Sequence, residues 1–189
     1  MNIALIDLNH MTAGVHTNTV PLGIGLIAKY LSKNIRRSLD VRMFKNPVKF
    51  LDALKSWKPD CLGMAQYCWN SELNLYAAGR AKEVNPDCLV IAGGPNLSLS
   101  KNEKIDFFKK WGFLDLCIAY DGEIPFAEII KRLTAGERPQ DILRVPPAGA
   151  YCLDRASGNM AESGAEAPRL VSLDEFGAMY ADGWFNDLL

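Results

Sequence analysis

Three short segments combine glycines, aromatic rings, an amide and carboxylates, residue types that are found both in ligand pockets and in plain tight turns. Gly93-Gly94-Pro95 follows a buried apolar run, and paired glycines let a ligand or backbone approach where a Cβ would collide. Tyr67-x-Trp69-Asn70 follows the preceding apolar run, and its two rings are typical of the roof of a pocket or a partner contact. Asp121-Gly122-Glu123 places carboxylates at an expected helix N-terminus, where capping and dipole stabilisation are a sufficient role.

Other reactive side chains lack the spacing that their chemistry requires. The five cysteines form no CxxC pair, which argues against a structural zinc site and favours a role as small apolar residues. His10 and His16 fall in one long loop, where metal ligation or acid–base chemistry competes with the commoner role of a solvated side chain. No Ser or Cys has the sequence of a nucleophile elbow, so a hydrolase has little support.

Gly23-x-Gly25-x-x-Ala28 matches the letters of the dinucleotide-binding fingerprint. That fingerprint requires a tight turn directly after a strand, whereas the loop 9–20 intervenes here. We therefore favour glycines that let the first helix pack closely on the sheet, and a nucleotide-binding enzyme ranks well below the other hypotheses. A phosphoacceptor receiver domain is excluded, because no Asp follows the third expected strand and no Lys follows the fifth.

The composition is typical of a soluble globular protein. The 189 residues carry 21 basic and 22 acidic side chains, and a formal net charge of -1 argues against electrostatic binding of nucleic acid. The apolar runs are far shorter than the ~20 residues of a membrane span, and the first residues lack the basic region of a signal peptide. We expect a cytoplasmic protein that contacts neither nucleic acid nor membranes.

Short apolar runs alternate with amphipathic segments along residues 1–134. The runs predict strands at 3–8, 39–44, 61–65, 88–92 and 114–120, each followed by a helix. Because each strand is apolar throughout, both faces of the sheet must be covered. The pattern predicts an α/β fold, a doubly wound five-stranded parallel sheet of flavodoxin-like or Rossmann-like type. Ligands of such sheets bind outside the carboxyl ends of the strands, where the three segments above lie.

Residues 135–189 are richer in turn and linker sequences, such as Pro146-Pro147 and Ser157-Gly158-Asn159. We expect an α/β domain at 1–134 and an irregular extension at 135–189. A late aromatic cluster without a core of its own favours docking on the domain or on a missing partner. When the radical core is absent, we expect an exposed apolar surface around Phe176, Tyr180 and Trp184, with disorder or a homodimer formed through it.

Taken in order, four stretches resemble the N-terminal cobalamin-binding domain of cobalamin-dependent radical S-adenosylmethionine (radical SAM) enzymes. They are residues 21–31, Tyr67-Cys68-Trp69-Asn70, Ile91-Ala92-Gly93-Gly94-Pro95 and Asp121-Gly122-Glu123-Ile124-Pro125-Phe126. The extension resembles the connector that precedes the radical core in that family. The resemblance implies that a corrinoid lies over the strand ends with its nucleotide tail inserted in the domain, and that the parent enzyme performs methyl transfer or other radical chemistry.

The resemblance also implies a set of cofactor-binding residues: Thr12, Gly14, Ala65, Gln66, Tyr67, Trp69, Asn70, Gly93, Gly94, Pro95, Asn96, Asp121, Gly122 and Glu123. Better-known cobalamin domains carry an Asp-x-His-x-x-Gly loop, and residues 7–14 hold these residue types at a different spacing. His10 is a weak candidate for a cobalt ligand, and we favour insertion of the tail without a histidine ligand.

The radical core of the family binds its 4Fe-4S cluster through CxxxCxxC, a spacing that this sequence lacks. We therefore expect S-adenosylmethionine and the cluster only in a fuller parent chain and no catalytic residue here. The radical SAM core is the expected partner, either in cis or missing, as in an excised domain or a stand-alone carrier. The alternative is a degenerate domain that acts as a docking or scaffold module without cofactor. Ala65, where better-known domains have Ser, and the altered loop spacing favour it.

Overall fold

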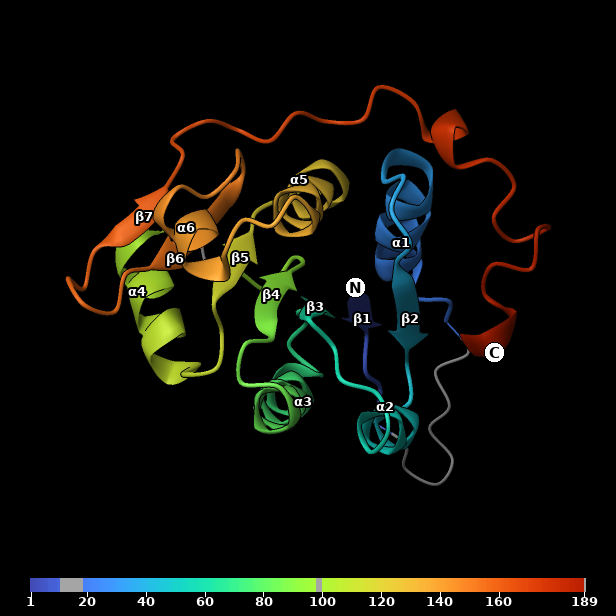
Figure 1. Ribbon diagram of the computed structural model, residues 1–189, viewed down its shortest axis with the longest axis horizontal. Coiled ribbons are helices and arrows are strands. Elements are labelled where there is room, and N and C mark those ends of the chain that lie inside the picture. The colour runs from blue at the N-terminus through green and yellow to red at the C-terminus, as the bar shows by residue number, and fades with distance from the viewer. Residues whose placement is uncertain (11–18, 98–99, 189) are drawn as a thin grey trace.

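The computed structural model describes residues 1–10, 19–97 and 100–188 and has an α/β fold built on one seven-stranded sheet (Figure 1). The strands lie in the order β2-β1-β3-β4-β5-β6-β7. Their bounds are β1 Asn2–Ile6, β2 Asp40–Phe44, β3 Cys61–Ala65, β4 Leu89–Gly93, β5 Leu116–Ile118, β6 Ala150–Leu153 and β7 Met160–Glu162. β1 to β5 pair in parallel, whereas β6 and β7 pair antiparallel.

The parallel strands confirm the doubly wound fold expected from the sequence. Ile3, Leu5 and Ile6 in β1 are completely buried, as both-face coverage requires. In the order 2-1-3-4-5 the chain leaves β1 in one direction and returns to β3 on its other side. The carboxyl ends of β1 and β3 therefore flank the switch point at which such sheets bind ligands.

Helices cover both faces of the sheet. Figure 1 shows α1 Leu22–Asn34 and α5 Glu123–Thr134 above the sheet and α2 Pro47–Leu54 and α3 Ser71–Val84 below it. Beyond β5, α4 Lys101–Lys110 contacts β6, and α6 Pro139–Arg144 contacts α5. Among the described residues, no helix combines the length and the apolar character that a membrane crossing demands.

Two antiparallel strands that the sequence did not predict extend the five parallel ones, because residues 139–162, expected to be irregular, contain α6, β6 and β7. Ser157-Gly158-Asn159 is the turn of a β6–β7 hairpin, in which Gly158 has φ +72° and Asp154 N donates to Asn159 O at 2.9 Å. β6 and β7 were missed because runs of four and three residues are too short to give a periodic signal. β6 covers the edge of β5 and places Tyr151 in the core.

The C-terminal segment packs on the outer face of α1, so the expected exposed surface is wrong for Phe176, which is only 2% exposed. Its 3-10 turns are η1 Leu173–Phe176 and η2 Asn186–Leu188. Trp184 is half-buried, while Tyr180 remains exposed as expected. Phe176 and Phe185 pack against Leu26 and Tyr30 of the same chain. This contact buries much of the apolar surface on which the homodimer prediction rests.

Candidate functional site

A pocket of about 180 Å³ lies at the carboxyl ends of β1, β3, β4 and β5, between α1 and α5. Its lining is mainly apolar, and Asp121 and Glu123 are its acidic residues. The lining residues are Leu5, Gly23, Ile24, Ile27, Gly63, Met64, Ala65, Tyr67, Ile91, Gly93, Gly94, Ile118, Tyr120, Asp121, Gly122, Glu123 and Phe126. A wider hollow around Met1, Arg37 and Asp60 lies at the amino ends of the strands, away from the predicted site residues and from the side that ligands of this fold use.

The Gly-Gly segment predicted from the sequence forms one wall of this pocket. A Cβ on Gly93 would have no heavy atom nearer than Ile118 O at 3.9 Å, so the space beside it is open. Gly94 has φ +114°, and a Cβ there would lie 2.9 Å from Gln66 O. Gly94 is therefore required by the backbone itself, whereas Gly93 leaves room for a ligand.

The glycines of α1 do something other than the close packing on the sheet expected from the sequence. Gly23 lines the pocket, and a Cβ there would meet no atom within 4 Å. Gly25 faces the C-terminal segment, where a Cβ would collide with the Phe185 ring. The two glycines of the fingerprint pattern therefore line the pocket (Gly23) and make room for the Phe185 ring (Gly25), and they do not form a phosphate-binding turn.

Tyr67 and Trp69 form a flat aromatic platform beside the mouth. Their rings stack with centroids 4.4 Å apart and an interplanar angle of 8°. Tyr67 lines the pocket, whereas 53% of Trp69 is exposed. His10 Nε2 lies 2.7 Å from Trp69 O, and since a carbonyl only accepts, Nε2 must donate there. That nitrogen is therefore committed to holding the platform.

A buried network of amides anchors the loop that carries the platform. Asn70 donates to Ala65 O at 3.0 Å and accepts from Tyr67 N at 2.9 Å. Asn74 donates to Gln66 Oε1 at 3.0 Å. Gln66, Asn70 and Asn74 are fully buried, so the amides of the predicted residues Gln66 and Asn70 fix the loop instead of lining the pocket. The sequence did not indicate Asn74, because nothing near it distinguishes a buried asparagine of a helix from an exposed one.

Two carboxyls near the strand ends are partly withdrawn from water. Burial raises the pKa of Asp7 to about 6, opposed by Lys45 and by a hydrogen bond from Asn70. Burial also raises the pKa of Glu123 at the start of α5, and Asp121 adds to this shift. Asn70 Nδ2 donates to Asp7 Oδ1 at 3.3 Å, so this carboxyl is tied to the loop that Asn70 anchors.

Tyr120, at the end of β5, is a pocket residue that the sequence did not single out. It has φ +58°, a backbone conformation that residues other than glycine rarely adopt, and 63% of it is exposed. Such strain tends to persist at functional sites. Arg169 lies 5.9 Å from its ring centroid and 3.6 Å from Asp121 Oδ2.

The predicted site residues thus fall into three groups. The pocket is lined by Ala65, Tyr67, Gly93, Gly94, Asp121, Gly122 and Glu123. Beside it lie Trp69 and the exposed Pro95 and Asn96, while Gln66 and Asn70 are buried behind it. Thr12 and Gly14 lie outside the described residues. Within the described part of the chain, no group of three or more His, Cys, Asp or Glu side chains is placed to hold a metal ion.

The pocket is smaller than the cavities that enclose a whole drug-sized ligand. Pockets that enclose drug-sized ligands measure about 300–1,000 Å³, so 180 Å³ suffices only for part of a larger ligand. The rest of such a ligand would lie outside, over the strand ends and against the platform. The missing Cβ of Gly93 provides the cradle that this arrangement needs.

Comparison with known proteins finds methyltransferases that are similar to the chain in sequence. No protein-family model matches the chain. It is 32% identical over 133 residues to a 2-(S-pantetheinyl)-carbapenam-3-carboxylate methyltransferase of Streptantibioticus cattleyicolor, covering 67% of this chain and 18% of that protein. It is 28% identical over 116 residues to the cobalamin-dependent radical SAM methyltransferase TokK of Streptomyces tokunonensis, covering 59% of this chain and 16% of TokK.

The fold is shared with a solved structure of the same kind. OxsB, a cobalamin-dependent S-adenosylmethionine radical enzyme solved with aqua-cobalamin and S-adenosylmethionine bound, superposes with a TM-score of 0.65 at 19% identity. The match covers 88% of this chain and 22% of OxsB. The chain is therefore a homologue of the cobalamin-dependent radical SAM methyltransferases and corresponds to a fraction of their length.

Proposed function

We propose that this chain is the cobalamin-binding module of a radical SAM enzyme, with the pocket taking the base of the cofactor's nucleotide tail. The observation that carries the proposal is the open space beside Gly93, at the carboxyl ends of the strands, in a fold shared with OxsB. The radical SAM core, with its 4Fe-4S cluster and S-adenosylmethionine, would lie in cis in the parent chain. When bound there, methylated cobalamin would supply the methyl group that the parent enzyme transfers.

The residues of this chain would bind and orient the cofactor. Ile24, Ile27 and Phe126 give the tail apolar walls, and the backbone at Gly93 and Gly94 allows close approach. The platform of Tyr67 and Trp69 offers a flat surface to the corrin. His10 is not needed as a lower ligand, because its Nε2 is held by Trp69 O.

Binding of hydroxocobalamin to the whole chain tests the proposal. We expect the pigment to co-elute with the protein on a sizing column and the ultraviolet–visible spectrum to change. Cobinamide, which lacks the nucleotide tail, should bind at least tenfold more weakly. A wild-type chain that binds neither corrinoid would overturn the proposal and favour the scaffold alternative.

Filling the pocket provides the matched comparison. Gly93→Leu places a side chain in the open space and should weaken hydroxocobalamin binding at least tenfold while leaving cobinamide binding little changed. Gly112→Leu is the control, because a Cβ at Gly112 would likewise have open space around it, with nothing within 4 Å, and Gly112 is not part of the pocket. Equal losses for both variants, or for both corrinoids, would contradict the assignment of the pocket to the tail.

A further inference from the structure

Residues 169–185, which we call the clasp, contact two walls of the pocket from outside. At one end Arg169 contacts the loop between β5 and α5, which carries Tyr120 and Asp121. It lies 3.6 Å from Asp121 Oδ2 and faces the Tyr120 ring. At the other end the clasp packs on α1, as Figure 1 shows by its course around that helix. Tyr120, Asp121 and α1 all contribute to the pocket, yet no clasp residue lines it.

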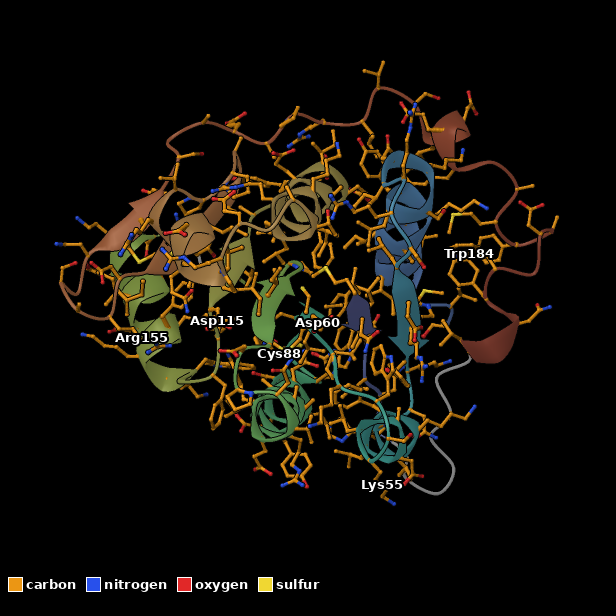
Figure 2. All side chains as sticks on the ribbon, viewed as in Figure 1. Lys55, Asp60, Cys88, Asp115, Arg155 and Trp184 are labelled. Atoms are coloured by element: carbon orange, nitrogen blue, oxygen red, sulfur yellow. The ribbon has the colours of Figure 1, made fainter. Side chains whose placement is uncertain are left out.

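The docking on α1 is specific rather than a loose apolar contact. Phe185 occupies the notch left by Gly25, and Trp184 Nε1 donates to Gly25 O at 3.3 Å. Figure 2 shows Trp184 lying between the C-terminal segment and α1. Lys29 Nζ lies 4.5 Å from the centroid of the Trp184 ring and 3.8 Å from Asp182 Oδ2. Phe176, Met179 and Phe185 are each less than 5% exposed.

The two faces of α1 divide these tasks. Ile24 and Ile27 face the pocket, whereas Gly25, Lys29 and Tyr30 contact the clasp. Successive residues of a helix are rotated by about 100°, so Ile24 and Gly25 point to different sides. Because the helix moves as a unit, a shift of α1 that disturbs one face also moves the other. Gly122, in the opposite wall, is close to α1, because a Cβ there would lie 3.3 Å from Ile27 Cδ1.

We propose that the clasp is a positioning element for the pocket: it holds α1 and the β5–α5 loop at the separation that the ligand requires. Phe185 and Arg169 are then positioning residues, which act without touching the ligand. This inference rests on the proposed function, because it needs a ligand whose binding can be measured. By thermodynamic linkage, docking of the clasp and binding of the ligand strengthen each other by the same factor.

The first test uses the wild-type chain with hydroxocobalamin and hydrogen exchange. Saturation with the corrinoid should slow exchange of the clasp amides at 173–185 about fivefold or more, although the ligand does not reach them. An unchanged exchange rate in a chain that does bind would overturn the clasp while leaving the proposed function intact. A wild-type chain that binds no corrinoid overturns both.

The second test undocks the clasp. Gly25→Leu fills the notch on the side of α1 that faces away from the pocket, and Leu is a good helix former. We expect faster exchange at 173–185 and hydroxocobalamin affinity about 5- to 100-fold weaker. Phe185→Ala combined with Met179→Ala should give the same result from the clasp side, which guards against misfolding of one variant.

The control variant is Val171→Ala, since Val171 is 98% exposed. It should leave both exchange and affinity unchanged. Wild-type affinity in a variant whose clasp exchanges as an undocked segment would overturn the inference.

Discussion

Asp7 is a carboxyl whose surroundings oppose its charge. Burial raises its pKa from 3.8 to about 6. Between pH 3.8 and about 6, Asp7 is therefore protonated in the folded chain but has lost its proton in the unfolded chain. Stability from this group is complete below pH 3.8 and is lost as the pH rises through about 6.

Asp7→Asn should remove this pH dependence. Its oxygen can still accept from Asn70 Nδ2, which lies 3.3 Å from Asp7 Oδ1. Relative to wild type, we expect the free energy of unfolding of the variant to rise by on the order of 2 kcal/mol between pH 4 and pH 8. Urea unfolding at both pH values measures this. An equal change in Asp106→Asn, an exposed site on α4, would contradict the prediction.

Gly93 and Gly94 are neighbours with opposite tolerance for a side chain. Gly94→Ala should lower the free energy of unfolding by about 1–3 kcal/mol, because φ is +114° and the new Cβ would lie 2.9 Å from Gln66 O. Gly93→Ala is the matched variant and should cost less than about 1 kcal/mol, since its Cβ meets open space. Similar losses at both positions in denaturant titrations would show that backbone conformation does not distinguish them.

At the scale of elements, the end of α4 depends on a residue of the β6–β7 turn. Arg155 Nη2 lies 3.1–3.4 Å from the carbonyl oxygens of Phe108, Trp111, Gly112 and Leu114 (Figure 2). A helix leaves its last carbonyls without intrahelical donors, and a cation there also complements the helix dipole. The hairpin thus caps the helix on which it packs.

Arg155→Ala should therefore loosen α4 and the hairpin together. We expect a loss on the order of 1 kcal/mol in the free energy of unfolding, and faster hydrogen exchange at 108–114. Arg144→Ala removes an arginine that is 75% exposed and should change stability by less than about 0.5 kcal/mol. Unchanged exchange at 108–114 in Arg155→Ala would exclude the cap.

Over the whole molecule, the sheet does not stop at residue 134. β6 pairs with the edge of β5, and Tyr151 packs edge-on against Phe108 with ring centroids 6.1 Å apart. A chain cut at 134 would expose that edge together with buried apolar side chains of α4 and β5.

We expect the fragment 1–134 to bind the dye ANS and to self-associate, as measured by fluorescence and light scattering. A fragment 1–168 retains β6 and β7, so it should stay monomeric with a smaller signal from the α1 face that the clasp covers. A monomeric fragment 1–134 without dye binding would support instead a domain boundary at residue 134.

The sequence by itself determined the parallel sheet and the end of it that carries the pocket. Continuous apolar strands separated by amphipathic helices allow few other arrangements, and topology places the strand exits at one edge. It also placed Gly93, Gly94, Tyr67 and Asp121 at this edge, because each lies at the end of a strand or within three residues of it. The cobalamin hypothesis arose from the order of these segments.

Tertiary structure alone decided which side each candidate faces and what covers the rest. The amides of Gln66 and Asn70 turn into a buried network with Asn74, because the loop needs partners for its own polar groups. Gly25 receives Phe185 from 160 positions along the chain, a contact that no local pattern encodes. The β6–β7 hairpin forms because β6 pairs with the free edge of β5. Local sequence preferences do not predict such a long-range pairing.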